Sequence, residues 1–535
     1  MSTITEDLKN LLISIRKDKL KLILFLFLLA NLIFLITWRI IDTRPPTWDP
    51  ATHLTSTVIY YTLLSSGNLN PLIWLKVDQY YPPLYTISAI PFYAIFHNAD
   101  GAVLVNFIYF CILVISTYLI TLEIVKDRKY ATLAGILVGV IPAILNLELG
   151  FMLDLPLASL VALSMYFLIK SEGFSDKKYG ILFGFAFGAA MLTKWSAFVF
   201  VIPPALYLLI VNLKRDNNYK NKEFLINLGK NILYCFVAFS VIALPWYLFN
   251  LKVVISSLFY FGYNVAKVEG NPNPISLASA AYYPHIMLLQ DLPEYLMLIF
   301  SIIVLFFINK KETLDEKEAS ILLWIFASLF ILTFILRNKK ARYILPLYSG
   351  IVTLFFISLK KLEVSEIKDT IKKYISYIPY VFLGISLISC VYCVPKPLHQ
   401  NWHADDIIRT IAKDVKKHPE LIYNDGRVVI AELQPCPYIN GRTLQYLALR
   451  DNYPFVVLNV AYITPIESMN NTQLAKLFSI FDYVIYKTGP YRTPWKFIVD
   501  KAVKFFDRYE LPYYTPIANY TLPNGETIII YRRNI

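Results

Sequence analysis

Long apolar windows recur through the first 395 residues of this 535-residue chain, and they constrain its fold more than any other feature. A helix needs roughly 20 mostly apolar residues to cross a bilayer. About eleven windows meet this need, at 20–41, 102–125, 131–146, 153–169, 179–194, 196–213, 231–249, 292–309, 319–336, 343–359 and 374–394. Charged residues make up 17% of the chain, against about 25% in soluble domains. The sequence therefore predicts a polytopic α-helical membrane protein with about eleven spans.

Lysine and arginine in the connectors predict how these spans are oriented. They collect before the first span and in every second connector after it, as at 126–129 and 360–373. Because basic connectors remain in the cytoplasm, the N-terminus is predicted to be cytoplasmic. The loop 42–100 and everything after about 395 are then extracytoplasmic. Four basic residues at 337–342 break the rule by lying outside, which calls for an anionic partner.

The composition changes after residue 395 to short apolar runs that alternate with helical patterns. Strands are expected at 427–432, 455–460, 482–487 and 526–532, and helices at 403–418, 440–451, 470–480 and 494–508. Alternation of this kind predicts an α/β domain with an at least partly parallel sheet. We therefore divide the chain into a transmembrane domain at 1–395 and an extracytoplasmic α/β domain at 396–535. Within the first, the outer loop 42–100 is expected to carry amphipathic helices at 51–66 and 83–97.

Charge, cysteine content and missing motifs exclude several classes of function. The chain has 51 basic and 38 acidic residues, a formal net charge of +13, but the basic residues follow the membrane topology, so no nucleic-acid partner is predicted. Five cysteines in so long a chain do not make a disulfide framework. The sequence also contains no phosphate-binding loop and no dinucleotide fingerprint, which argues against direct use of a nucleotide.

Acidic residues at the outer ends of two spans are candidates for acid–base chemistry. Asp49 follows the first span, with Pro50 after it and His53 one helical turn later. Its plainest interpretation is a helix N-cap, and the alternative is a carboxylate that takes a proton from an acceptor. Glu148 lies in the short connector before the fourth span, and Asp154 lies at the start of that span. Asp154 is either an N-cap or a functional group, because an acidic residue entering a span is costly unless it is paired.

Basic and aromatic residues on the same side are candidates for substrate binding. Lys194 stands between two apolar windows with almost no loop, where it either snorkels or meets a phosphate. Arg337 and Arg342 belong to the outer basic run, and an arginine can hold phosphate oxygens with two hydrogen bonds. Tyr81 and Tyr85 surround a Pro-Pro pair that suits an interfacial belt or a sugar platform, and His285 is a weaker candidate ligand. The candidate substrate-binding residues are thus His53, Tyr81, Tyr85, Glu148 and His285.

Five stretches together carry a family resemblance. They are Trp48-Asp49 with His53, Tyr81-Pro82-Pro83-Leu84-Tyr85, Asp154-Leu155-Pro156-Leu157, Gly188-Ala189-Ala190-Met191-Leu192-Thr193-Lys194, and Arg342-Tyr343-Ile344-Leu345-Pro346. From about 20 to 395, the chain resembles the polyprenyl-phosphate-dependent glycosyltransferases of the GT-C fold. It is similar in particular to the dolichyl-phosphate-mannose–protein mannosyltransferases and the bacterial aminoarabinose–lipid A transferases.

The resemblance implies a GT-C-like cell-membrane enzyme that moves a sugar from a polyprenyl phosphate to a lipid, protein or glycan acceptor. By this resemblance Asp49 matches the first-loop catalytic carboxylate, Asp154 the second acidic position, and Lys194 and Arg342 the contacts to the lipid phosphate. We extend the phosphate-binding set to Arg337. Many relatives have an acidic residue where this chain has Pro50. Metal use therefore stays open, with a divalent cation as the one candidate cofactor.

Two other classes of function compete with the transferase hypothesis. A polytopic lipid or glycan transporter would also line a path with charged residues, but transporters usually contain inverted repeats and broken helices at the midplane. No repeat is visible in this sequence. A receptor or assembly protein would use the outer domain for binding and the spans as an anchor, a role for which about eleven spans are too elaborate. The transferase interpretation is therefore preferred.

Overall fold

The computed structural model describes residues 17–307, 314–365, 369–421, 426–463, 466–490 and 493–534. They form two compact units. The membrane unit comprises the chain up to Ile36, Asp78–Tyr85 and Leu104–Lys396. The α/β unit comprises Thr37–Val77, Thr86–Val103 and the chain from Pro397 onward. Most of the first outer loop thus belongs to the same unit as the C-terminal residues, a grouping that the apolar windows do not reveal.

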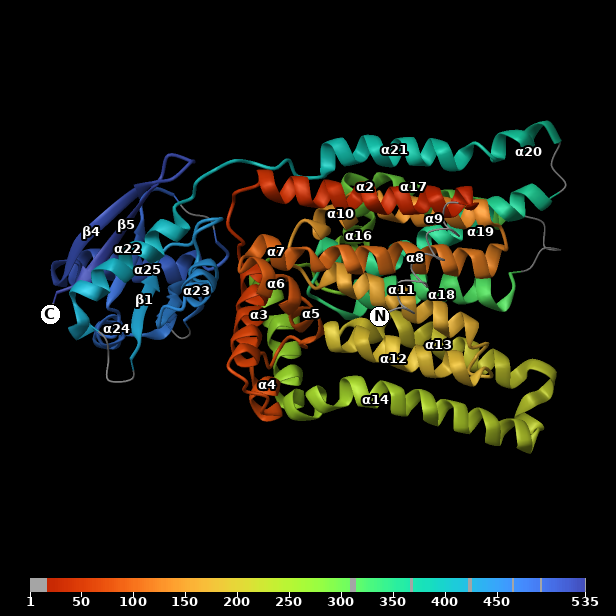
Figure 1. The fold of residues 1–535 in the computed structure, drawn as a ribbon, viewed down its shortest axis with the longest axis horizontal. Helices are drawn as coiled ribbons and strands as arrows, with labels where there is room; N and C mark the ends of the chain where they lie inside the picture. The colour runs from red at the N-terminus through yellow and green to blue at the C-terminus, as the bar shows by residue number, and fades with distance from the viewer. Residues whose placement is uncertain are drawn as a thin grey trace. The chain divides into compact units, whose positions relative to one another are not determined.

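Long helices that lie side by side build the membrane unit (Figure 1). They are α2 (Lys19–Ile41, which continues into the other unit), α8 (Val105–Val125), α9 (Arg128–Gly139), α10 (Pro142–Glu148), α11 (Asp154–Lys170), α12 (Lys177–Thr193), α13 (Ala197–Lys214), α14 (Lys222–Phe259), α16 (Leu277–Gln290), α17 (Leu292–Phe307), α18 (Glu316–Phe330), α19 (Tyr348–Val364), α20 (Asp369–Ile375) and α21 (Ile378–Cys393). Each predicted apolar window coincides with one of these helices or with a broken pair of them.

Among the described residues, seven helices are long and apolar enough to cross a membrane, or up to nine if each bent pair counts as one span. The pair α9 and α10 bends by 58°, and the pair α16 and α17 by 118°. The predicted number of about eleven is therefore not confirmed by this count. Helices α11 and α12, with 17 residues each, are at the short limit for a span and account for the difference.

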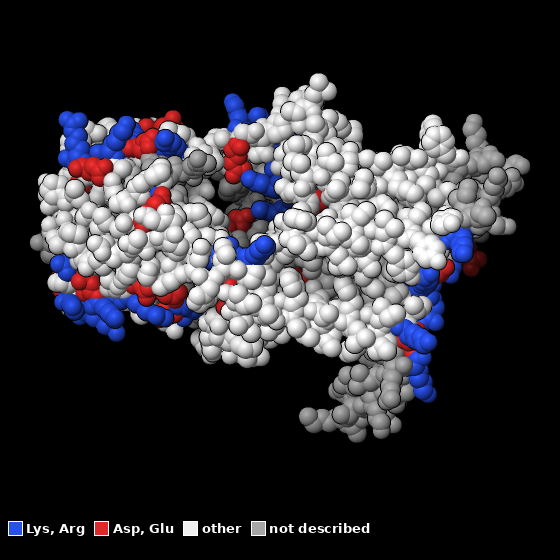
Figure 2. Space-filling model, turned by 90° about the horizontal axis from the view of Figure 1, so that it is seen from above, with Lys and Arg blue, Asp and Glu red and all other residues white. Residues whose placement is uncertain are grey.

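Charged side chains are distributed on the membrane unit as a bilayer requires. Its surface is uncharged over a broad zone, and lysines and arginines gather at one end (Figure 2). Apolar side chains such as Leu206, Leu248 and Phe306 are exposed on this unit. Lipid, and not water, surrounds such a surface in a membrane, so the exposure of these apolar side chains is not unfavourable there. The unit is thus a multi-pass helical membrane domain.

Two glycines let α12 and α14 approach each other closely. A Cβ atom at Gly184 would lie 2.2 Å from the carbonyl oxygen of Cys235, and one at Gly188 would lie 3.0 Å from that of Phe239. Small residues four positions apart are a common device for close helix packing in membranes, where no hydrophobic effect drives helices together. The close contact between these two helices is therefore possible only because Gly184 and Gly188 have no Cβ atom.

Replacing Gly184 by Ala is expected to destabilise the protein by about 1–3 kcal/mol, because the added methyl overlaps the backbone of α14. Gly180, on the same helix, is the matched control, since an added Cβ there meets no atom within 4 Å. Thermal unfolding in detergent measures the difference. An equal midpoint for the Gly184→Ala and Gly180→Ala proteins would contradict the packing argument.

The C-terminal residues of the α/β unit form a mixed sheet with strand order β2-β1-β3-β5-β4. The strands are β1 (Val428–Glu432), β2 (Phe455–Asn459), β3 (Tyr483–Lys487), β4 (Tyr514–Thr521) and β5 (Thr527–Arg533). Strand β1 pairs in parallel with β2 and β3, whereas β5 pairs antiparallel with β3 and β4. The partly parallel sheet is as predicted, but β4 was not expected. It is an edge strand that carries Pro516, and half of its residues are exposed, so it lacks an apolar run.

Helices from the C-terminal residues and from the loop complete this unit. They are α22 (Ala404–Lys417), α23 (Gly441–Arg450), α24 (Asn471–Phe478) and α25 (Lys496–Phe505), together with α3 (Asp49–Ser65), α4 (Pro71–Lys76), α6 (Ile90–Phe96) and α7 (Ala99–Val103) from the loop; α5 (Leu84–Ser88) crosses the unit boundary. The two amphipathic helices expected in the loop correspond to α3 and to α5 with α6.

Hydrogen bonds to the C-terminal residues hold the start of the loop. The hydroxyl of Thr443 donates to the carbonyl oxygen of Pro46 at 2.8 Å. The amide of Asn440 donates to the hydroxyl of Thr47 at 2.7 Å, and that hydroxyl donates to the carbonyl oxygen of Pro437. The backbone just ahead of Asp49 is therefore fixed by groups that lie almost 400 positions later in the sequence.

Candidate active site

A buried carboxylate with two cations forms the most distinctive polar site of the membrane unit. Lys194 Nζ lies 2.6 Å from Asp154 Oδ1, and Arg342 Nε lies 3.2 Å from Asp154 Oδ2. The side chain of Asp154 is 2% exposed, that of Lys194 11% and that of Arg342 29%. The structure thus brings together three predicted site residues from distant parts of the sequence. Their summed charge is +1.

Helix ends position all three side chains. Asp154 is the first residue of α11, where the helix dipole favours a carboxylate. Lys194 is the residue after α12, in an extended conformation that separates it from α13. Arg342 lies in the short 3-10 helix η4 (Ala341–Leu347). Of the two alternatives for Lys194, snorkelling is not observed, because its ammonium group donates a hydrogen bond to Asp154 within the protein.

An aromatic ring contacts both cations. The Tyr343 ring centroid lies 4.8 Å from Lys194 Nζ and 5.8 Å from Arg342 Cζ. A cation over an aromatic face is stabilised by about 0.5–2 kcal/mol, more where water is excluded. Tyr343 is a site residue that the sequence-based list missed, although it adjoins Arg342. It holds the two cations next to each other without neutralising either of them.

The outer basic run turns out to be engaged largely by the protein itself. Lys339 is buried, and its ammonium donates to the carbonyl oxygens of Leu332, Thr333 and Leu336 at 2.8–2.9 Å, where it caps the preceding helix. Lys340 pairs with Glu269 at 2.8 Å. Arg337 is half-buried, and its Nε has no hydrogen-bond partner among the described residues. Three of the four basic residues thus have partners within the protein, which weakens the argument that the run alone requires an external anion.

Asp49 and His53 lie in the α/β unit. Asp49 is the first residue of α3 and Trp48 is the N-cap, so the prediction that Asp49 itself caps the helix is wrong by one residue. Trp48 has a φ of +50°, a conformation that costs an L-residue of order 1–3 kcal/mol and that often marks a functional site. Its ring packs edge-on against Tyr462. His53 follows one turn later and is buried.

Glu148 and Tyr85 are fixed in a buried network of the membrane unit. Asn31 donates to Glu148 Oε2 at 2.9 Å, and Asn106 donates to the backbone carbonyls of Glu148 and Gly150 at 2.8 and 2.7 Å. The hydroxyl of Tyr85 donates to Asn106 Oδ1 at 2.7 Å. Both Tyr85 and Glu148 have no exposed surface. The predicted substrate contact through Tyr85 is therefore not supported, and the tyrosine anchors the loop 148–150.

The remaining predicted residues are more accessible. Tyr81 is half-buried, and its backbone N–H donates to Asp78 Oδ1 at 2.8 Å in a turn that places its ring against Tyr80. His285 is exposed on α16. The part of the chain that the structure describes contains no group of three or more His, Cys, Asp or Glu side chains that could hold a metal ion. Asp154, the best single carboxylate for such a role, already holds two cations.

Comparison with known proteins agrees with the predicted resemblance. Residues 23–261 match the family model of the dolichyl-phosphate-mannose-protein mannosyltransferases. No curated protein matches the sequence. ArnT from Cupriavidus metallidurans bound to undecaprenyl phosphate has a similar structure, with a TM-score of 0.59 and 14% identity over 95% of this chain and 97% of that chain.

Two further structures are similar to a lower degree. ArnT from the same organism in the apo state has a TM-score of 0.57 and 14% identity over 95% of this chain and 97% of that chain. The arabinosyltransferase EmbB from Mycobacterium smegmatis has a TM-score of 0.39 and 10% identity over 68% of this chain and 37% of that chain.

The similarity to ArnT over nearly the whole length establishes the fold class. The chain is a multi-pass helical membrane protein of the GT-C fold with a C-terminal α/β domain, as the sequence predicted. The resemblance to the mannosyltransferase family is likewise confirmed over residues 23–261. The first half of the chain is therefore similar in sequence to glycosyltransferases, and nearly the whole chain has the fold of ArnT.

Proposed function

We propose that the protein is an integral-membrane glycosyltransferase that moves a sugar from a polyprenyl phosphate to an acceptor at the extracytoplasmic face. The observation that carries this proposal is the group of Asp154, Lys194 and Arg342, in which two cations meet at one buried carboxylate inside an apolar helical unit. A lysine and an arginine held side by side are the donors that proteins use to bind the oxygen atoms of a phosphate. The phosphate of a membrane lipid is an anion that reaches this depth.

The same group suits the departure of the phosphate from the sugar. Lys194 and Arg342 are held by Asp154 before any ligand binds, so they need not reorganise as negative charge develops on the leaving oxygen. Asp154 is therefore a positioning residue in this proposal, in place of a base. Arg337, whose Nε lacks a partner in the described structure, is a third donor for the phosphate. The lipid tail would lie along the apolar surface of the spans.

The acceptor is activated by Asp49 in this proposal. Its carboxylate takes the proton of an acceptor hydroxyl or amine, the acceptor atom bonds to the anomeric carbon, and the bond to the phosphate oxygen breaks on the opposite side. A single displacement of this kind inverts the anomeric configuration. His53, Tyr81 and His285 are candidates for contacts to the sugar or acceptor.

The proposal predicts incorporation of label from a lipid-linked sugar. Membranes that contain the protein would be supplied with a panel of polyprenyl phosphates carrying different radiolabelled sugars, and the label followed into lipid, protein and glycan fractions. We expect transfer from at least one donor, and none in membranes lacking the protein. Nucleotide sugars serve as the negative control. Transfer from a nucleotide sugar alone, or movement of intact donor across the bilayer without bond cleavage, would contradict the proposal and favour a transporter.

A further inference from the structure

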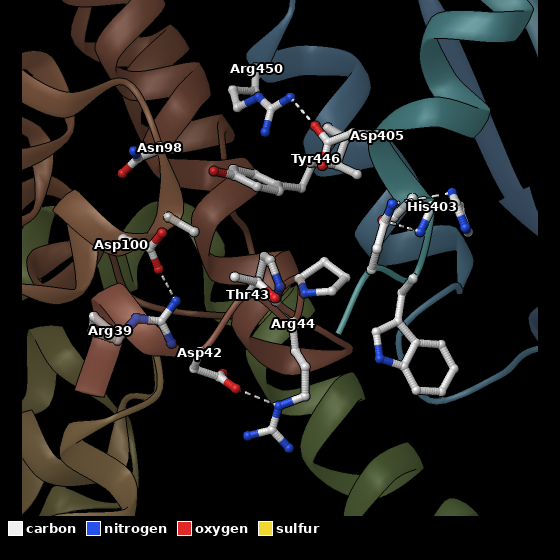
Figure 3. Close-up of a pocket in the computed structure, with 17 residues that line it drawn as sticks. Arg39, Asp42, Thr43, Arg44, Asn98, Asp100, His403, Asp405, Tyr446 and Arg450 are labelled. Carbon is white, nitrogen blue, oxygen red and sulfur yellow. Dashed lines mark hydrogen bonds and ion pairs between the residues drawn. The ribbon is translucent and has the colours of Figure 1, made fainter. Parts of the chain in front are cut away.

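A polar pocket lies entirely within the α/β unit, and none of the proposed catalytic or phosphate-binding residues lines it (Figure 3). Three parts of the chain line it: residues 39–46, residues 98–100 at the start of α7, and side chains of α22, α23 and the residues just before α22. Its cavity volume is about 140 Å³. An engineered protein cavity of about 150 Å³ holds a single benzene ring. The pocket is of similar size and is open to solvent, so a sugar ring could enter it with part of its surface still in contact with water.

The charges of this pocket are balanced. Its lining contains three arginines and three aspartates, so the formal charges, +3 and −3, sum to zero. Arg39 pairs with Asp100, Arg44 Nε lies 2.6 Å from Asp42 Oδ1, and Arg450 lies 2.5 Å from Asp405 Oδ1. Because each guanidinium already has a carboxylate, the pocket offers no excess charge to a phosphate or a free carboxylate. It therefore favours a neutral ligand over an anion.

The same pairs place donors and acceptors side by side. The arginines are mostly buried, at 12–18% side-chain exposure, whereas Asp100 and Asp405 are 49% and 41% exposed and keep oxygen atoms available. An amide from Asn98 adds both a donor and an acceptor at the rim. Neighbouring hydroxyl groups on a sugar ring each donate and accept one hydrogen bond, which matches fixed pairs of N–H and carboxylate groups.

Tyr446 supplies a buried group that lacks a partner. The residue is 1% exposed, and its hydroxyl has no hydrogen-bond partner within the described residues. Figure 3 shows this hydroxyl directed toward Asn98 and Asp100. Burial raises the pKa of Tyr446, so the phenol stays neutral and can donate as well as accept. A buried hydroxyl without a hydrogen-bond partner is unfavourable by about 1–3 kcal/mol. A ligand hydroxyl that bonds to Tyr446 would remove this penalty, which favours binding.

From these observations we propose that the α/β unit binds one neutral sugar ring of a glycan in this pocket, with Tyr446, Asn98 and the Arg–Asp pairs holding its hydroxyl groups. The inference goes beyond the proposed transfer reaction, since binding here needs neither the donor lipid nor any of the proposed catalytic residues. It gives the α/β unit a role in recognising carbohydrate.

Binding of simple glycosides to the full-length protein in detergent tests this inference. The probes are methyl glycosides of glucose, galactose, mannose and xylose, with glucuronate and inorganic phosphate as charged comparators, and the readout is saturation-transfer NMR followed by titration. We expect at least one neutral glycoside to bind. Neither phosphate nor glucuronate should displace it. Failure of all four glycosides to bind, or displacement by a charged comparator, would overturn the proposal.

Two variants assign the binding to this pocket. Tyr446→Phe removes only the hydroxyl, and Asn98→Ser removes the amide while keeping an oxygen that can cap α7. Each should weaken glycoside binding by about tenfold. Tyr509→Phe, which removes an exposed hydroxyl of the same unit, should bind like the wild type. Wild-type affinity in both pocket variants would refute the assignment. Because the readout is binding, the result is independent of whether sugar transfer occurs.

Discussion

Replacement of Asp49 by Asn is expected to lower sugar transfer by about 10²–10⁴-fold, the contribution typical of general-base catalysis. Asn has the shape of Asp but cannot take a proton, so the acceptor stays poorly nucleophilic. Asp49 begins α3, and its neighbours Pro46 and Thr47 are fixed by hydrogen bonds to the C-terminal residues. The substitution should therefore leave the backbone and the binding of polyprenyl phosphate unchanged.

Asp176→Asn is the matched control for this variant. Asp176 is the N-cap of α12 and accepts from the N–H of Tyr179, a role that Asn fulfils equally well. We expect wild-type transfer from this control. Initial rates with a labelled lipid-linked sugar, together with the affinity for sugar-free polyprenyl phosphate, separate chemistry from binding. Full transfer activity in the Asp49→Asn protein would contradict the role of Asp49 as base.

Hydropathy predicted the helical unit well because each span is defined by its own sequence. A bilayer forces every backbone group into an internal hydrogen bond, so an apolar run of sufficient length becomes a helix without help from distant residues. Hydropathy did not predict the positions at which the helices bend. The 118° bend between α16 and α17 occurs at Asp291, inside a segment whose apolar character alone marks only the second helix.

The α/β unit was harder to predict because its boundaries depend on contacts between distant residues. Strands β1, β2, β3 and β5 have apolar runs and were expected, whereas the edge strand β4 has none. Nothing in the local sequence of 37–77 indicates that it forms one unit with residues after 396. That grouping arises from pairs such as Thr443 with Pro46, which no periodicity encodes.

The sequence predicted which residues belong to the candidate site. The structure added which of them contact one another. Asp154 and Lys194 were singled out because a charge near a span is costly unless it has a partner. Arg342 was singled out because its basic run breaks the orientation rule. The sequence could not identify the partner, which proved to be one shared carboxylate. Lys339 shows the limit of the reasoning, since its charge is used to cap a helix inside the protein.

Removing either cation from Asp154 is expected to weaken the binding of polyprenyl phosphate by about 10–100-fold, since a hydrogen bond to a charged group contributes about 1.5–3 kcal/mol. Lys194→Ala and Arg342→Ala each remove one of the two cations that lie at Asp154, and with it a donor for the phosphate. Lys340→Ala is the matched control, because Lys340 belongs to the same basic run but pairs with Glu269. We expect wild-type affinity from this control.

A double variant, in which Asp154→Asn is combined with Lys194→Ala, tests whether Lys194 binds phosphate or has only a structural role. Each alanine variant leaves the buried Asp154 with one cation fewer, which by itself destabilises the unit. Asp154→Asn removes that carboxylate charge, so combining it with Lys194→Ala should restore thermal stability toward the wild type while donor affinity stays low. If the double variant regained both stability and affinity, Lys194 would serve only to neutralise Asp154, and its proposed contact with the phosphate would be wrong.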